Sequence, residues 1–110
     1  MNVGVVGSRT FSDYKKLSET LDKYAITTIV SGGAKGADSL AEKYAKAYGL
    51  EMVVFKPNWE LGKRAGRLRN SDIVNASDMI VAFWDGKSKG TLDSINKAEL
   101  CNKFVEIVYF

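Results

Sequence analysis

Residues 26–49 read ITTIVSGGAKGADSLAEKYAKAYG and contain, in order, an apolar run, a glycine-rich turn and an amphipathic segment. The run Ile26–Val30 has the length and the β-branched composition of a buried strand. In residues 37–48 one apolar stripe recurs at helical spacing opposite lysines and glutamates, and Gly49 supplies a helix stop. The stripe consists of Ala37, Leu40, Ala41, Tyr44, Ala45 and Tyr48. These residues predict a strand–turn–helix unit, from which parallel α/β sheets are built.

The remainder of the chain repeats this alternation of short apolar runs and helical periods. Five runs are predicted to be strands: Asn2–Val6, Ile26–Val30, Glu51–Phe55, Met79–Trp84 and Phe104–Val108. Four helices are expected: Tyr14–Ala25 with Ser12 as its N-cap, Ala37–Tyr48, one within Asn58–Ala76, and one from about Gly90 to Asn102. With right-handed crossovers, this pattern predicts a Rossmann-like α/β fold, a three-layer α/β/α sandwich with a five-stranded parallel sheet and four helices.

The whole-chain composition fits one domain spanning residues 1–110, with 45% hydrophobic and 26% charged residues. No apolar stretch approaches the roughly 20 residues needed to cross a bilayer, and no signal-peptide pattern is present. We therefore expect a cytoplasmic protein without a membrane partner.

The chain has no histidine and one cysteine, which excludes a Cys/His zinc set, a histidine general base and an intrachain disulfide. Cys101 comes late in the last predicted helix, so we expect it to pack as a small hydrophobe. In the same helix, the spacing predicts that Leu92, Ile95 and Ala98 face inward.

Function is expected where the strands end, because ligands of open α/β sheets bind outside the carboxyl ends of the strands. After the first strand, Gly7, Ser8 and Arg9 form a simple turn or, as we favour, a site where the guanidinium holds a phosphate or carboxylate. After the second strand, the glycine loop places backbone N–H groups at a helix N-terminus, which favours an anion. The residues expected to surround that anion are Ser31, Gly32, Gly33, Ala34, Gly36 and Ala37.

Asp38, at the end of the glycine loop, complements the helix dipole or accepts hydrogen bonds from ribose hydroxyls. The loop matches neither the Gly-x-Gly-x-x-Gly fingerprint nor a P-loop. Its glycines nevertheless favour a phosphate-binding loop over a plain strand-to-helix turn.

Two further segments at strand ends carry candidate ligand-binding residues. The net charge is only +3, but Lys63, Arg64, Arg67 and Arg69 lie within seven residues, next to Asn70. This cluster is either a solvated helix face or an anion site; Gly62 and Gly66, which a merely solvated helix would avoid, favour the anion site. After the fourth strand, a second glycine-containing turn offers Asp85, Ser88, Lys89, Gly90 and Thr91, and Trp84 either stacks on a base or packs internally.

Four of these segments together resemble the SLOG superfamily, named for the Smf/DprA and Lonely Guy proteins, and in particular its small YspA/YpsA-related branch. They are Gly7-Ser8-Arg9, the loop from Ser31 to Asp38, Arg69-Asn70, and Ser88-Lys89-Gly90-Thr91. The resemblance implies a Rossmann-like fold that recognises nucleotides or nucleotide-derived molecules. Lonely Guy-like members cleave a base from a nucleoside monophosphate with an arginine and a glutamate, and DprA-like members bind single-stranded DNA.

Arg69 matches the arginine of the Lonely Guy-like members and is the expected catalytic residue if the chain is an enzyme. Ser94 occupies the position of the glutamate, and Asp93 is one residue away, which is about 100° around a helix. The missing carboxylate disfavours the phosphoribohydrolase reaction. The Lys63–Arg69 cluster is compatible with nucleic acid, but no aromatic residues are interleaved with it.

We therefore favour a binding or sensing module for a nucleotide-derived small molecule, either NAD- or ADP-ribose-like or a nucleoside monophosphate, held by Arg9, Arg67 and Arg69. The alternatives are a hydrolase of an N-glycosidic or phosphate bond and a single-stranded nucleic-acid-binding protein. Asp38 and Asp85 could share Mg²⁺ with ligand phosphates, but two separated acids do not define a metal site, and we predict none. Tyr109 and Phe110 are candidates for packing in a homo-oligomer.

Overall fold

A computed structural model describes residues 1–110 and contains a five-stranded parallel sheet with the strand order β3-β2-β1-β4-β5. The strands are β1 (Asn2–Gly7), β2 (Thr28–Ser31), β3 (Glu51–Val54), β4 (Met79–Trp84) and β5 (Phe104–Tyr109). The helices are α1 (Tyr14–Leu21), α2 (Ala37–Tyr48), α3 (Ala65–Ala76) and α4 (Lys89–Leu100), with a 3-10 segment, η1 (Trp59–Arg64), before α3. The predicted fold class is confirmed.

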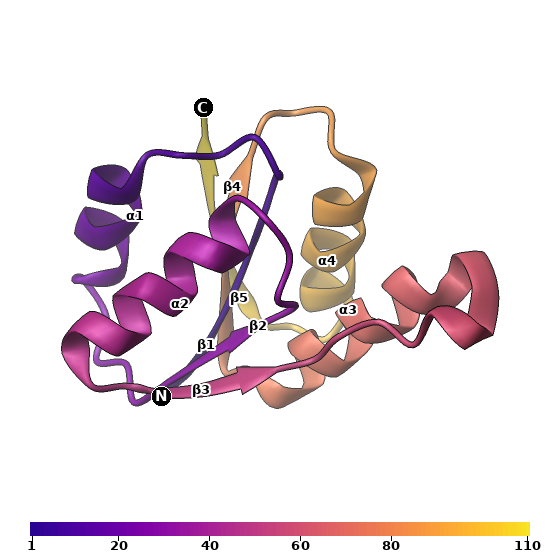
Figure 1. The fold of residues 1–110 in the computed structure, drawn as a ribbon, viewed down its shortest axis with the longest axis horizontal. Helices are drawn as coiled ribbons and strands as arrows, with labels where there is room; N and C mark the ends of the chain where they lie inside the picture. The colour runs from indigo at the N-terminus through magenta and orange to yellow at the C-terminus, as the bar shows by residue number, and fades with distance from the viewer.

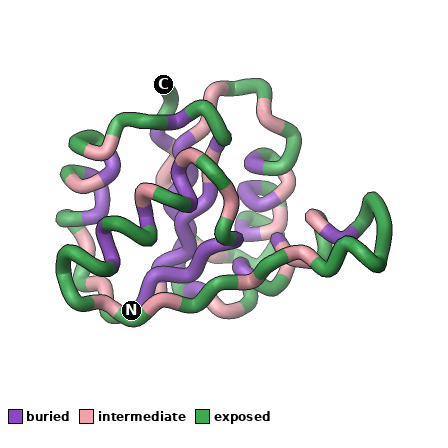
Figure 2. The backbone as a smooth tube through the Cα atoms, viewed as in Figure 1, coloured by how far each residue is buried: buried purple, intermediate pink, exposed green.

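The sheet lies between two helical layers, with α1 and α2 on one face and α3 and α4 on the other (Figure 1). The side chains of β1 alternate between the two faces of the sheet and contribute to both hydrophobic cores. Val3 and Val5 pack with α1 and α2, whereas Val6 packs with α3 and α4. The central strands are accordingly the most buried part of the chain (Figure 2). None of the helices is long and apolar enough to cross a membrane.

The strand order creates a switch point at the centre of the sheet. The chain first builds outward from β1 through β2 to β3, and then returns to place β4 on the other side of β1. The loops that leave β1 and β4 therefore diverge to opposite faces, and a crevice opens between them. In open α/β sheets, ligands generally bind at such a crevice.

The strand–turn–helix unit predicted from residues 26–49 is present, with small differences at its ends. Gly49 ends α2 in the left-handed conformation, at φ 65° and ψ 30°, and its N–H donates to the carbonyl of Ala45. The predicted stripe is buried at Ala37, Ala41, Tyr44 and Ala45. Tyr48 was wrongly expected inside: it is 56% exposed, and its ring packs on Tyr44 instead of on the sheet.

The predicted boundaries of α1 and β2 were wrong by a few residues. Asp13, not Ser12, caps α1, and its carboxylate accepts the N–H of Lys16 at 3.0 Å. The helix ends at Leu21, so that residues 22–27 form a turn, and β2 starts at Thr28. The N–H of Thr27 donates to the carbonyl of Met1, which aligns the turn with the start of β1.

Leu92 and Cys101 were also predicted to be buried in or near the last helix, and both predictions were wrong. Ile95 and Ala98 are buried, but Leu92 is 38% exposed, and the inward places beside it are taken by Thr91 and Ser94. Cys101 is exposed rather than packed, because α4 ends at Leu100 and Cys101 lies in the turn after it.

The third helical region is divided by a break. Gly62 has φ 74° and ψ −149°, which are not helical values, so the 3-10 segment of residues 59–64 is kinked at Gly62 before α3 begins at Ala65. No residue of η1 is buried. The segment projects from the body of the molecule beside α3 (Figures 1 and 2).

Gly36→Ala is predicted to be strongly destabilising. Gly36 has φ 77° and ψ −127°, and a Cβ there would lie 2.4 Å from the carbonyl oxygen of Ser8. We expect the free energy of unfolding in urea to fall by at least about 2 kcal/mol, because both the backbone conformation and the contact are unfavourable. Gly49→Ala is the control, since it has positive φ but no neighbour within 4 Å, and should cost about 1 kcal/mol. Equal costs for the two variants would contradict the close approach.

Candidate functional site

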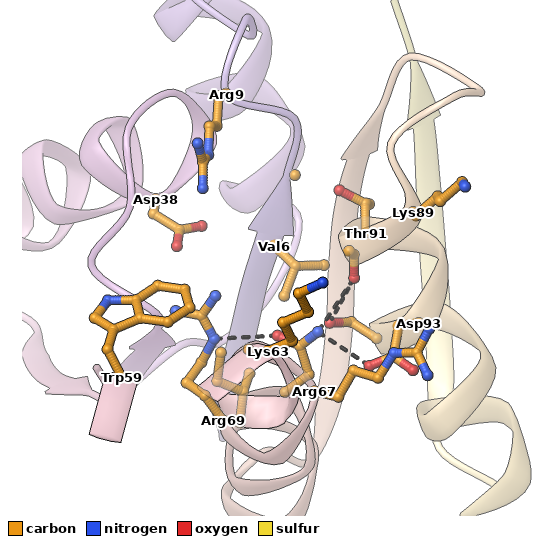
Figure 3. Close-up of a pocket in the computed structure, with 16 residues that line it drawn as sticks. Val6, Arg9, Asp38, Trp59, Lys63, Arg67, Arg69, Lys89, Thr91 and Asp93 are labelled. Carbon is orange, nitrogen blue, oxygen red and sulfur yellow. Dashed lines mark hydrogen bonds between the residues drawn. The ribbon is translucent and has the colours of Figure 1, made fainter. Parts of the chain in front are cut away.

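Two cavities lie at the carboxyl edge of the sheet. The first, of about 260 Å³, opens between the end of β1, α3 and the N-terminus of α4. Figure 3 shows its labelled side chains reaching it from both helical layers, except that the side chain of Lys89 extends away from the others. Its lining consists of Val6, Gly7, Arg9, Asp38, Trp59, Lys63, Gly66, Arg67, Arg69, Asn70, Ile73, Lys89, Gly90, Thr91, Asp93 and Ser94.

The second cavity, of about 580 Å³, lies over the glycine loop. Besides the loop residues Gly32–Lys35, it is lined by Ser39 and by Lys56 and Pro57, which follow β3. Arg9, Trp59 and Arg69 line both cavities. We therefore treat the two cavities as one groove, divided by these three side chains.

Arg69 connects α3 to the glycine loop. Its Nη1 donates to the carbonyl of Gly32 at 2.8 Å, and its Nε donates to Oδ1 of Asn70 at 3.1 Å. A Cβ at residue 32 would lie only 2.1 Å from Nη1, so glycine is required for the guanidinium to lie over the loop. Nη2 has no hydrogen-bond partner within the chain and is free to bind a ligand.

Asn70 and Asp93 fasten α3 to α4 beneath the groove. Nδ2 of Asn70 donates to the carbonyl of Gly90 at 3.3 Å and to Oδ2 of Asp93 at 3.1 Å. Lys97 also donates to Oδ2 of Asp93, at 2.9 Å. Oδ1 of Asp93 makes no hydrogen bond within the chain and remains available as an acceptor.

Asp93 and Ser94 both line the first cavity, although they are neighbours on one helix. Both reach it because the cavity extends along the first two turns of α4, from Lys89 to Ser94. A carboxylate is thus present in the cavity, one residue before the position at which the resemblance places it.

The glycine loop binds a carboxylate of the protein itself, that of Asp38. Oδ2 of Asp38 accepts the N–H of Ala34 at 3.1 Å, and Asp38 is only 7% exposed. Burial raises the pKa of Asp38 above its ordinary value, although the N–H of Ala34 and the charge of Arg69 oppose that rise. The N–H groups of Lys35 and Gly36 have no acceptor within the chain, and of these two residues only Lys35 lines the groove.

The loop after β4 is braced by its own polar side chains. Oδ1 of Asp85 accepts the N–H groups of Lys87 and Ser88, each at 2.8 Å, which holds the pKa of Asp85 below its ordinary value. The N–H of Asp85 donates to Oγ of Ser8, which joins this loop to the one after β1. Oγ of Ser88 in turn caps α4 by accepting from Thr91. These contacts leave the N–H groups of Lys89 and Gly90 unpaired at the first cavity.

The structure brings twelve of the predicted ligand-binding residues to the groove: Gly7, Arg9, Gly32, Gly33, Ala34, Asp38, Arg67, Arg69, Asn70, Lys89, Gly90 and Thr91. The other predicted residues lie outside the lining: Ser8, Ser31, Gly36, Ala37, Trp84, Asp85 and Ser88. Trp84 has an internal place, since its Nε1 donates to the carbonyl of Ser88 at 3.0 Å and its ring packs against Tyr109.

Lys63, from the basic cluster favoured as an anion site, also lines the groove, whereas several lining residues were not predicted, chiefly Trp59, Lys35, Lys56, Asp93 and Ser94. Trp59 and Lys63 lie on either side of the break at Gly62, which helical spacing does not reveal. The one signal in the sequence was the position of Trp59 directly before the basic cluster. No group of three or more Asp, Glu, Cys or His side chains gathers anywhere in the chain in a way that could hold a metal ion.

Asp38→Asn should change how stability depends on pH. Because the folded-state pKa of Asp38 is raised, folding takes up a proton, and the wild-type protein loses stability as the pH rises through and above the ordinary carboxyl pKa of about 4. The amide keeps an oxygen for the N–H of Ala34 but does not titrate. We therefore expect the unfolding free energy of Asp38→Asn, relative to wild type, to increase between pH 4 and pH 7 in urea titrations.

The matched control for this experiment is Asp72→Asn, an exposed carboxyl on α3 outside the groove. Its difference from wild type should change little with pH. A difference for Asp38→Asn that is flat, or that decreases with pH, would show that Asp38 is not held in the buried position described.

Comparisons with known proteins agree with this architecture. A family model described as the YspA, cpYpsA-related SLOG family matches residues 1–62. The Gene 61 protein of Mycobacterium phage D29 is 32% identical over a 108-residue alignment that covers 86% of each chain. DNA processing protein A (DprA) from Streptococcus pneumoniae has a similar fold, with a TM-score of 0.80 and 20% identity over 96% of this chain. This chain spans only 49% of that structure's chain. The chain therefore belongs to the YspA, cpYpsA-related SLOG family, as its loop and arginine motifs indicated.

Proposed function

We propose that the groove binds a nucleotide or nucleotide-derived small molecule, with its phosphate at the junction of the two cavities. The observation that carries this proposal is the charge of the first cavity. Five of its lining residues are cationic, and none of them forms a salt bridge within the chain: Arg9, Lys63, Arg67, Arg69 and Lys89. Like charges gathered in this way are stabilised by an anion.

The position of the phosphate follows from which donors are free. Arg9 and Arg69 line both cavities, and Nη2 of Arg69 is unpaired. The unpaired N–H groups of Lys89 and Gly90 lie at the first cavity, at the N-terminus of α4. The helix dipole adds to the attraction of a phosphate there. A guanidinium and a helix N-terminus together are well suited to phosphate oxygens.

Hydroxyl groups of the ligand have acceptors in the same cavity. Oδ1 of Asp93 is unpaired while Oδ2 is held by Asn70 and Lys97, so the carboxylate is both available and fixed in orientation. A ribose beside the phosphate would supply such hydroxyls. The second cavity leaves about 580 Å³ for a further part of the ligand, as in an NAD- or ADP-ribose-like molecule.

Membership of a SLOG family supports a nucleotide- or nucleic-acid-related binding role in general terms. The fold likeness to a DNA processing protein makes single-stranded nucleic acid the main competitor as ligand. We favour the small molecule because the unpaired donors converge on one cavity at the carboxyl edge of the sheet, whereas the exposed segment η1 presents only Lys63 and Arg64 as cations.

Calorimetry with adenosine monophosphate, ADP-ribose and a twelve-residue oligothymidylate tests the proposal. We expect the wild-type protein to bind one of the two nucleotides, and Arg69→Ala to weaken that binding by about tenfold or more, through loss of a charge-assisted contact. Arg64→Ala is the matched control, because Arg64 is exposed and lines neither cavity. No nucleotide binding at millimolar concentration, or binding of the oligonucleotide alone, would overturn the proposal.

One observation favours hydrolysis of an N-glycosidic bond as a second candidate function. The carboxylate of Asp93 lies in the same cavity as Arg69, with its free oxygen available to orient a water molecule or to stabilise positive charge developing on the sugar. This role would compensate for Ser94, which has no carboxylate.

The hydrolase candidate predicts release of free base when nucleoside monophosphates are incubated with the protein and separated by chromatography. Asp93→Asn should abolish that release while nucleotide binding is retained, because the amide keeps the shape of the side chain but not its charge. Asp72→Asn should be as active as wild type. An unchanged substrate peak with the wild-type protein would exclude the reaction for those nucleotides.

A further inference from the structure

Trp59 is the one large aromatic side chain in the groove, and it is 67% exposed. It lines both cavities, and Figure 3 shows its indole extending over the groove beside the guanidinium of Arg69. Leu61 and Leu68, the neighbouring exposed apolar residues, line neither cavity. The exposed indole therefore faces the cationic site, whereas the nearby leucines do not.

A proline and two local hydrogen bonds shape the backbone that carries Trp59. Pro57 restricts the chain just before it, and Asn58 caps η1 by accepting the N–H of Glu60 through its side chain at 3.2 Å. The carbonyl of Asn58 also accepts the N–H of Leu61 at 3.0 Å. The indole itself makes no hydrogen bond within the chain, so its ring face and its Nε1 are both available.

The second tryptophan provides a contrast within the same molecule. Trp84 packs against Tyr109 and the apolar core, and its Nε1 is hydrogen-bonded to the carbonyl of Ser88. It therefore has the contacts of a structural residue. Trp59 has none of these contacts, and burial of its flat apolar surface requires something from outside the chain.

We propose that Trp59 is the base-recognition residue of the groove and stacks on a planar aromatic base whose phosphate is held by Arg9 and Arg69. The inference rests on the proposed function and names its ligand class: a molecule with both a base and a phosphate, not a sugar phosphate alone. Stacking on an indole is tolerant of base identity, because every base has a π-face. The sugar spans the distance between the base and the phosphate.

The test compares ligands that differ only in the base. Ribose 5-phosphate and the four ribonucleoside monophosphates are titrated against wild-type protein, Trp59→Ala and Trp59→Phe by calorimetry. We expect the best nucleoside monophosphate to bind wild type at least about tenfold more tightly than ribose 5-phosphate. Trp59→Ala should remove this preference and leave the affinity for ribose 5-phosphate within about twofold, and Trp59→Phe should retain part of the preference.

Two controls separate stacking from a general effect on the segment. Leu61→Ala changes another exposed apolar residue of η1 outside the groove and should leave both affinities unchanged. In Trp84→Phe, where Trp59 is the only tryptophan, the nucleotide should quench fluorescence and ribose 5-phosphate should not.

The failures of the two proposals are distinguishable. Equal wild-type affinity for ribose 5-phosphate and for every nucleoside monophosphate would overturn the role of Trp59 and leave the phosphate site intact. The same conclusion follows if Trp59→Ala weakens ribose 5-phosphate and nucleotide equally. Absence of binding by all of these ligands and by ADP-ribose would overturn the proposed function, and the role of Trp59 with it.

Discussion

The groove depends on the close approach of Arg69 to Gly32. The guanidinium donates to the carbonyl of Gly32 at 2.8 Å, in space that any Cβ at residue 32 would occupy. This contact joins a helix on one face of the sheet to a loop whose own helix covers the other face. The glycine therefore serves a purpose different from the one its sequence context suggested, since it makes room for an arginine of the protein.

The charges around this contact are arranged so that the acids of the protein do not neutralise the cations of the groove. Asp38 and Asp93 lie among the cations, but each is already bound, Asp38 by the N–H of Ala34 and Asp93 by Asn70 and Lys97. Neither forms a salt bridge with an arginine of the groove. The acids thus shape and orient the site, and the free guanidinium and helix N–H donors are left for an anion from outside.

The fold was predictable because each strand and helix of this chain carries a local signal. The β-branched runs and the stripe of α2 reflect burial on a sheet covered on both faces, and this periodicity is visible without tertiary information. Errors occurred where ends are set by distant contacts, as at Thr28, whose strand starts beside Met1. Leu92 and Cys101, which are exposed, show the same limit. Residue spacing predicts which face of a helix is apolar, but not how much of that face the rest of the protein buries.

The candidate site was partly predictable for the same reason. Arg9, the glycine loop, Arg69 and Gly90 follow strand ends, and the topology of a parallel sheet brings such residues together. Trp59 and Asp93 could not be placed, since Trp59 lies in an irregular 3-10 segment with no buried residue and Asp93 depends on how far a cavity extends along α4. The most direct test of the central claim is a ¹⁵N–¹H chemical-shift titration of the assigned protein with adenosine monophosphate. The account predicts that the largest shifts fall at Arg9, Gly32–Gly36, Arg69-Asn70 and Lys89–Thr91; shifts confined to α1 and β5, or no shifts at saturating nucleotide, would contradict it.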